Sequence, residues 1–200
     1  VVVDDQGENL IAVASGANID IAPPDVRRAV VELAPKVILA NLEVSDDVVV
    51  AAARSAPRAA VFILNPAPFR PILPELLAAA SVLTPNEHEA RAMLGGEFEG
   101  RDVARLAEGA GISRAHLVIT VGARGALRVT GQEVFSYHAA EVDAVDTTGA
   151  GDAFNGVLAA NLSAGASIDE AIESAVAAAT VATQAIGARA GMPTKAVVEE

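Results

Sequence analysis

The sequence of 200 residues contains no cysteine, so it can form neither a disulfide framework nor a thiolate metal site. This absence fits the reducing cytoplasm, where we expect the protein to be. Basic residues are also scarce, because 14 Lys and Arg stand against 26 Asp and Glu and give a formal net charge of −12. Binding to nucleic acids or anionic membranes depends on clustered Lys and Arg. Neither partner is therefore expected, and a phosphate ligand would have to be held by local dipoles.

Long uninterrupted apolar runs are missing as well. The most apolar long stretch, residues 171–188, includes Glu173 and Gln184, which suits a buried helix better than a membrane span. We find no signal peptide pattern. The chain opens without Met, already inside a strand-like pattern, which suggests that it is a fragment of a longer protein.

Hydrophobic residues make up 52% of the chain and charged residues 20%, which is typical of a packed globular protein. A chain of this length can build one sizeable core, whereas two independent cores are not expected. We therefore expect one domain over residues 1–200.

Strand-like and helix-like patterns alternate along the chain. Residues 1–3 and 10–14 resemble a strand pair, and alternating helices and strands follow. The predicted helices cover residues 23–34, 46–56, 73–80, 150–163 and 168–186. The predicted strand regions cover residues 36–43, 60–68, 81–89, 116–131 and 133–145. This alternation predicts an α/β fold with three layers, a mostly parallel, doubly wound sheet between helices. Ligands of such sheets bind beyond the carboxyl ends of the strands.

The stretch DTTGAGD, residues 146–152, lies where a strand pattern passes into a helix pattern. Gly149 and Gly151 allow a tight turn and a close approach to a ligand, and the following amides belong to a helix N-terminus, which favours anions. Asp152 falls in the first helical turn, where a carboxylate can act as a general base. The alternative interpretation is an ordinary strand-to-helix turn with Asp152 as a capping residue.

Two further strand ends carry polar or glycine-rich segments. In TVGARG, residues 120–125, the glycines and Arg124 are suited to cradling nucleotide phosphates, although a plain hairpin turn is equally consistent. In TPNEHE, residues 84–89, an amide and carboxylates cluster at a predicted helix start. They suit phosphate and hydrated Mg²⁺, but also simple helix capping. Glu43 ends another apolar run, where it can either cap the next element or hold a sugar hydroxyl.

Other common sites lack their signatures. There is no GxxxxGK motif for a P-loop, no early GxGxxG for a dinucleotide fold and no GxSxG for a hydrolase. The three histidines are scattered without metal-site spacing, so ordinary solvated or satisfied side chains are expected.

Taken together, these segments resemble the ribokinase-like family of carbohydrate kinases, which includes adenosine kinase and fructokinases. DTTGAGD matches that family's signature, while TPNEHEA, TVGARGA, LNPAP and DDQGENLIAVASGAN follow in the same order and cover essentially the whole chain. The last of these stretches favours the ribose-phosphorylating branch. The resemblance implies a ribokinase-like fold and transfer of phosphate from ATP to O5 of D-ribose, giving ribose 5-phosphate.

The resemblance also implies residue roles. Asp152 would be the base, and the amides of Gly149, Ala150 and Gly151 would form the anion hole. The nucleotide contacts would come from Asn86, Thr120, Gly122, Ala123, Arg124, Gly125 and Gly151. Glu89 would help to organise Mg²⁺ through water, and Glu43 would touch the ribose. A site for K⁺ would comprise Asp146, Thr148, Thr183, Ile186, Ala188 and Gly191.

The departure from the family pattern lies upstream. Family members begin with a segment that carries an Asn-x-Asp element, a sugar-binding glycine loop and a β lid that forms a homodimer interface, and this chain shows none of it. We therefore expect the longer protein to be a homodimer and the isolated 200 residues to lack appreciable ribose kinase activity. Exposed edges should also make the isolated chain poorly soluble. The alternatives are another sugar or nucleoside kinase, a nucleotide-binding regulatory module and a purely structural domain.

Overall fold

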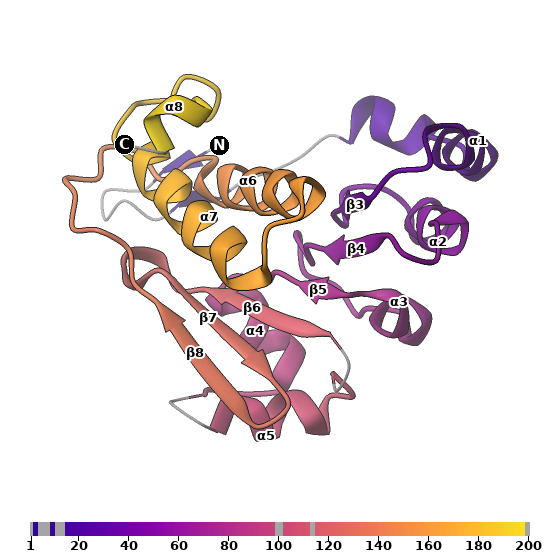
Figure 1. The fold of residues 1–200 in the computed structure, drawn as a ribbon, viewed down its shortest axis with the longest axis horizontal. Helices are drawn as coiled ribbons and strands as arrows, with labels where there is room; N and C mark the ends of the chain where they lie inside the picture. Colours follow the sequence, from indigo (N-terminus) through magenta and orange to yellow (C-terminus); the bar gives the residue numbers. More distant parts are fainter. Residues whose placement is uncertain (1, 4–8, 11–14, 99–101, 113–114, 199–200) are drawn as a thin grey trace.

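The structure is a computed structural model that describes residues 2–3, 9–10, 15–98, 102–112 and 115–198. Its centre is a sheet of six strands in the order β3-β4-β5-β6-β7-β8 (Figure 1). The strands are β3 Val37–Ala40, β4 Val61–Leu64, β5 Val82–Leu83, β6 His116–Thr120, β7 Ala126–Thr130 and β8 Glu133–Tyr137. Strands β3 to β6 pair in parallel, and β7 and β8 are added in antiparallel fashion. The sheet is thus mostly parallel, as predicted.

A separate two-stranded ribbon precedes the sheet. Strand β1 (Val2–Val3) pairs antiparallel with β2 (Asn9–Leu10). This confirms a strand pair at the start of the chain, although most of the predicted second strand, residues 11–14, lies outside the described residues.

Helices cover both faces of the sheet. They are α1 Pro23–Leu33, α2 Asp46–Ser55, α3 Pro74–Ala79, α4 Glu87–Leu94, α5 Asp102–Gly109, α6 Ala150–Ala164, α7 Ile168–Ala182 and α8 Lys195–Val198, with 3₁₀ turns η1 Gly16–Asp20 and η2 Gly122–Arg124. Helices α6 and α7 pack against each other on one face, while the helices between strands pack on the other (Figure 1).

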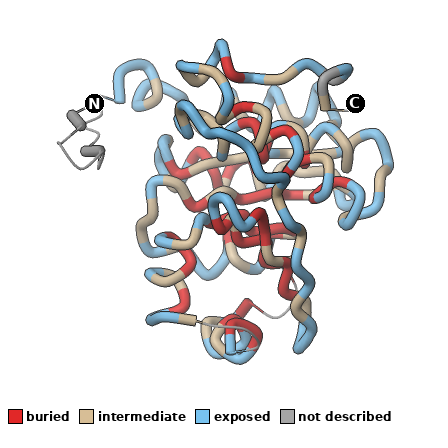
Figure 2. The backbone as a smooth tube through the Cα atoms, turned by 90° about the vertical axis from the view of Figure 1, so that its left-hand side faces the viewer, coloured by how far each residue is buried: buried red, intermediate tan, exposed pale blue. Residues whose placement is uncertain are grey.

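Alternation along the strands creates the two cores. In β4, Phe62 and Leu64 belong to the core beneath α2 to α5, whereas Ile63 points into the core beneath α6 and α7. This is the period-two pattern of a strand buried on both faces. Buried segments accordingly run through the middle of the molecule, with exposed segments around them (Figure 2). The predicted three-layer α/β fold is confirmed.

Several element ends differ from the prediction, and those of α7 and β8 bear on the site. Helix α7 stops at Ala182 rather than at residue 186, because the Thr183 carbonyl accepts the amides of Val145 (2.7 Å) and Asp146 (3.0 Å). Strand β8 stops at Tyr137, so residues 138–145 run as irregular chain.

Helix α6 runs antiparallel to β3. Lys36, just before β3, donates from Nζ to the carbonyl of Ser163 near the end of α6 (3.4 Å). The beginning of α6 therefore lies at the carboxyl ends of the strands, where ligand sites of such sheets are found. Among the described residues, no helix is both long and apolar enough to cross a bilayer.

Candidate active site

The turn into α6 is built around Gly149. Its backbone has φ of +83°, in the left-handed region that glycine adopts most readily, and helix α6 begins at the next residue. The first amides of a helix have no acceptors within that helix, so they can bind an anion. One of them is already engaged, since the amide of Ala150 donates to the carbonyl of Thr147 at 3.2 Å.

A cavity of about 350 Å³ opens at this turn. Its lining joins Ala150 and Gly151 of α6 to Thr120, Gly122, Ala123 and Gly125 at the end of β6. The volume lies within the usual range of small-molecule sites, about 300–1,000 Å³. The structure thus brings together the two glycine-bearing segments, which lie more than twenty residues apart in the sequence.

Most of the remaining wall of the cavity was not predicted from the sequence. Apart from Thr183, which was predicted as part of the cation site, it consists of Ala139, Ala140, Glu141, Val142, Ala144, Thr147, Phe154, Val176, Ala179 and Thr180. Part of this wall lies in residues 138–145, which the sequence pattern assigned to a strand. Small residues with little chemical signature form most of it, so only their position in the fold reveals them.

Gly125 fixes the loop that carries the β6 side of the cavity. Its φ is +93°, and a Cβ there would lie 2.0 Å from the carbonyl oxygen of Tyr137. Glycine is therefore required both for conformation and for space. By contrast, a Cβ on Gly151 would meet no atom within 4 Å, which leaves its cavity side open to a ligand.

Asp152 follows Gly151 in the first turn of α6 and is exposed. It lies beside the cavity rather than in its lining. A carboxylate at this place is accessible to a substrate hydroxyl that approaches the first-turn amides.

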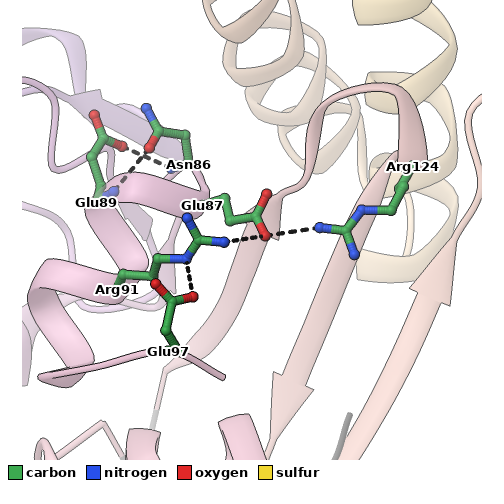
Figure 3. A network of polar contacts seen from close by, with 6 residues as sticks. All are labelled: Asn86, Glu87, Glu89, Arg91, Glu97 and Arg124. Carbon is green, nitrogen blue, oxygen red and sulfur yellow. Dashed lines mark hydrogen bonds and ion pairs between the residues drawn. The ribbon is translucent and has the colours of Figure 1, made fainter. Parts of the chain in front are cut away.

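Asn86 and Glu89 form a capping box at the start of α4 (Figure 3). The Asn86 side chain accepts from the Glu89 amide (2.9 Å), and Glu89 Oε2 accepts from the Asn86 amide (2.7 Å). The capping interpretation of this motif is thus present in the structure. Burial raises the pKa of Glu89, partly offset by its bond to the Asn86 amide. Neither residue lines the cavity, although Asn86 forms a parallel bridge with Thr120, which does.

Arg124 points away from the cavity and toward α4. Its guanidinium donates to Glu87 Oε1 at 2.8 Å, and Arg91 donates to the same oxygen at 3.0 Å (Figure 3). Arg91 also pairs with Glu97 (2.7 Å). The side chain of Arg124 is 68% exposed. In this structure, Arg124 anchors the η2 turn to α4, while its neighbours Ala123 and Gly125 face the cavity.

Asp146 bonds to Thr148 and Thr183 of the predicted cation site, and also to Gly187, which was not predicted. Its carboxylate accepts from the amide of Thr148 (2.9 Å) and from the amide of Gly187 (2.8 Å). Hydrogen bonds from the Thr148 side chain and from the Thr148 and Gly187 amides lower the pKa of Asp146. Asp146 therefore joins the DTTGAGD turn to the segment after α7.

The segment after α7 packs closely on the turn. A Cβ on Gly149 would lie 2.9 Å from the Cβ of Ala188, and a Cβ on Gly191 would lie 2.5 Å from the Ala182 carbonyl oxygen. Thr183 also lines the cavity, and Ile186 is exposed. The described residues contain no group of three His, Cys, Asp or Glu side chains able to hold a metal ion.

Glu43 lies apart from these residues. It follows β3, is exposed, and its amide donates to Asn41 Oδ1 (3.2 Å). Strands β4 and β5 separate β3 from β6, and Glu43 does not line the cavity.

Comparison with known proteins gives a consistent result. A family model described as pfkB family carbohydrate kinase matches residues 1–195. A ribokinase of Bacillus subtilis is 34% identical over 197 residues, covering 98% of this chain and 65% of the relative. A ribokinase of Haemophilus influenzae is 35% identical over 194 residues, covering 94% and 63%. The chain thus spans somewhat less than two thirds of these relatives.

Solved structures share the fold. A ribokinase from Thermotoga maritima matches with a TM-score of 0.85 and 29% identity, covering 98% of this chain and 66% of the other. A ribokinase from Arabidopsis thaliana complexed with ribose and ATP matches with a TM-score of 0.84 and 26% identity, over the same shares.

Proposed function

The chain belongs to the pfkB family of carbohydrate kinases, and from this premise we propose that it carries the nucleotide and phosphoryl-transfer site of an ATP-dependent ribose kinase. The reaction would convert D-ribose and ATP into ribose 5-phosphate, ADP and a proton. The observation that carries the proposal is the shared cavity between the β6 loop and the first turn of α6, with Asp152 beside it.

The nucleotide would lie along the loop after β6. Thr120, Gly122, Ala123 and Gly125 present backbone groups and small side chains at the cavity, and the apolar wall suits a nucleobase. Asn86 and Arg124 are proposed as further ATP contacts, which requires their side chains to extend beyond their present partners in α4.

Phosphoryl transfer would take place at the turn into α6. Asp152 would accept the proton of the ribose O5 hydroxyl as that oxygen bonds to the γ-phosphorus and the bond to the ADP oxygen breaks. The amides of Gly149, Ala150 and Gly151 would stabilise the charge on the transferred group, for which the Ala150 amide has to leave the Thr147 carbonyl. Positioning and charge stabilisation provide most of the catalysis in reactions of this kind.

Two cations are part of the proposal. Magnesium neutralises charge on the ATP phosphates when bound. Glu89 uses Oε2 in the α4 cap, so it would reach a hydrated ion through Oε1 and water. The K⁺ site would lie around Asp146, whose carboxylate is ionised. The other oxygen ligands would be the backbone carbonyls of Thr148, Thr183, Ile186, Ala188 and Gly191.

Glu43 is proposed as a ribose contact. We propose that the site lies in one domain and that the protein is a cytoplasmic homodimer.

A substrate panel tests the proposal. ADP release would be measured for the longest natural form of the protein with ribose, deoxyribose, fructose and adenosine, with and without K⁺. Strongest turnover with ribose is expected, whereas sugar-independent ADP release, or none, would contradict it. Preference for another sugar or nucleoside would support the alternative, a related kinase activity, since Glu43, the proposed ribose contact, lies outside the cavity.

A further inference from the structure

A buried polar contact joins the sheet to α6 behind the cavity. Thr84, which follows β5, is 1% exposed, and Asn155 on α6 is 7% exposed. The hydroxyl of Thr84 donates to Oδ1 of Asn155 at 2.6 Å. Removing one partner of such a contact is destabilising, because it leaves the other polar group buried without a hydrogen bond.

This contact belongs to a longer chain of hydrogen bonds. Asn65, which follows β4, donates from Nδ2 to the Thr84 carbonyl at 2.6 Å. Asn155 in turn donates from Nδ2 to the carbonyl of Gly151 at 2.9 Å. The bonds run in one direction from the ends of β4 and β5 to the first turn of α6. Their last acceptor is the residue that lines the cavity and precedes Asp152.

Packing alone does not require an asparagine here. The neighbouring Phe154 and Leu158 are 1% and 0% exposed and already fix α6 on the sheet through apolar contact. Asparagine is also a weak helix former. Apolar contacts are non-directional, whereas a fully satisfied buried hydrogen-bond chain rigidifies the helix turn and specifies its position.

We propose that Asn155, held by Thr84, is a positioning residue that fixes the first turn of α6 relative to the sheet. Through the Gly151 carbonyl it holds the Gly151 amide and the Asp152 carboxylate in register with the nucleotide loop after β6. The inference rests on the proposed kinase function, and it assigns no contact with substrate to either residue.

Helix α6 contains a matched control. Asn161 donates from Nδ2 to the carbonyl of Val157 at 3.0 Å, the same bond to the fourth residue before it that Asn155 makes. Asn161 lies near the far end of α6, away from the cavity, and is partly buried. It therefore reproduces the local bond without the link from Thr84 to the cavity turn.

The test compares four variants of the longest natural form of the protein: Thr84→Val, Thr84→Ser, Asn155→Leu and Asn161→Leu. In Thr84→Val and Asn155→Leu, kcat should fall about ten- to hundredfold with KM for ATP changed by less than about threefold, because small misplacements of reacting groups are costly. Thr84→Ser keeps the hydroxyl and should restore kcat to within about threefold of wild type. Asn161→Leu should leave kcat within about twofold.

Two further measurements separate positioning from loss of stability. The double variant Thr84→Val/Asn155→Leu should be no slower than Asn155→Leu alone, because both substitutions break one chain. Backbone NMR order parameters at Gly151 and Asp152 should fall in Asn155→Leu and stay unchanged in Asn161→Leu. If Asn155→Leu does not fold, Thr84→Val, which nearly conserves volume, decides the outcome.

The proposal is overturned if kcat in Thr84→Val and Asn155→Leu falls no further than in Asn161→Leu, or if Thr84→Ser fails to restore it. A wild-type protein that prefers another sugar would overturn only the proposed substrate, and the same comparison would be run with that sugar. Where no sugar is phosphorylated, the proposed function fails, and the order parameters alone decide whether Asn155 holds the turn.

Discussion

Asp152 carries the proposed proton transfer, so its carboxylate is the first group to replace. Asp152→Asn should lower kcat by about 10²- to 10⁴-fold, because the amide cannot accept the hydroxyl proton, with ATP affinity nearly unchanged. Steady-state kinetics and calorimetry with ATP measure the two effects. Asp47 is a matched control, since it is an exposed aspartate in the first turn of α2. Asp47→Asn should leave kcat unaltered, and full turnover by Asp152→Asn would contradict the base assignment.

Gly149 is constrained by both conformation and space. Gly149→Ala should destabilise the protein by about 1–3 kcal/mol, because the residue has φ of +83° and a Cβ would lie 2.9 Å from that of Ala188. Urea unfolding measures the change. Gly156 lies within α6 with open space around it, so Gly156→Ala should be stabilising by up to about 1 kcal/mol. Equal effects of the two substitutions would show that the Gly149 turn is not constrained.

Residue chemistry in the sequence identified only part of the site. The turns at DTTGAGD and TVGARG could be predicted, because backbone conformations with positive φ favour glycine and both segments contain it. Asn155 has no comparable signature in the sequence, since α6 contains a second asparagine, Asn161, that makes the same local bond. The partner of Asn155, Thr84, lies 71 positions away, and only the packing of α6 on the sheet brings the two together.

Among the connections between elements, the Asp146 carboxylate ties the turn before α6 to the segment after α7. Hydrogen bonds lower the pKa of Asp146 in the folded state below its ordinary value of 3.8. The ionised carboxylate therefore stabilises the folded state fully at pH values above 3.8. This stabilisation is lost as the pH falls through the lower pKa of the folded state. The stability difference between wild type and Asp146→Asn should therefore be constant near neutral pH and shrink in strong acid. Thermal unfolding across pH 2–7, about the range in which carboxylates titrate, measures this. A difference independent of pH would contradict the tether.

The ion pairs of Glu87 connect α4 to the η2 turn. Glu87→Gln should leave stability within about 1 kcal/mol, because all three side chains of these pairs are at least partly exposed to solvent. It should also release Arg124 toward the ATP phosphates and tighten ATP binding about two- to fivefold, as expected for one added charge near a solvated anion. Calorimetry measures the affinity. The gain should disappear in Glu87→Gln/Arg124→Ala, and a gain that persists there would rule out Arg124 as its source.

Elements such as β4 and α6 lie where the sequence predicted them, because the spacing of their apolar residues is clear. The predicted and observed ends differ where tertiary contacts determine the last residue of an element. The apolar pattern continues past Ala182, but the amides of Val145 and Asp146 use the Thr183 carbonyl and end α7 there. Helix α5 was not predicted at all. The apolar spacing in this segment is short and lies between polar, glycine-rich stretches. The segment forms a helix because its apolar residues pack on the sheet.

Across the whole molecule, apolar side chains remain exposed at one end. Helix α1 buries no residue fully, and Val31 and Leu33 are 69% and 77% exposed. If the chain from Val1 to Glu200 is produced alone, we expect concentration-dependent association, because apolar side chains are exposed and β3 lies at the edge of the described sheet. Val31→Glu/Leu33→Glu should reduce association in sedimentation velocity. Arg27→Glu, which changes the net charge by the same amount at an exposed polar position of α1, should not, and equal behaviour would locate the association elsewhere.

The layered fold was predictable as a whole because alternating helices and strands with short connections admit few arrangements. The cavity was predictable only as a location, at the carboxyl ends of the strands. Its wall depends on irregular residues 138–145 and on α7, whose small side chains carry no chemical signature. Glu43, predicted as a ribose contact, follows β3 at the expected edge and lies outside the cavity, so its role stays a prediction.

The contact between Gly149 and Ala188 has a consequence for directed evolution. The two positions are 39 residues apart, yet even a methyl group on Gly149 would come within 2.9 Å of the Ala188 side chain. Libraries that diversify the tail from Gln184 onward should therefore keep Gly149 unchanged. Selection for altered cation preference in that tail would then act on the remaining positions, with the turn before α6 as a fixed boundary.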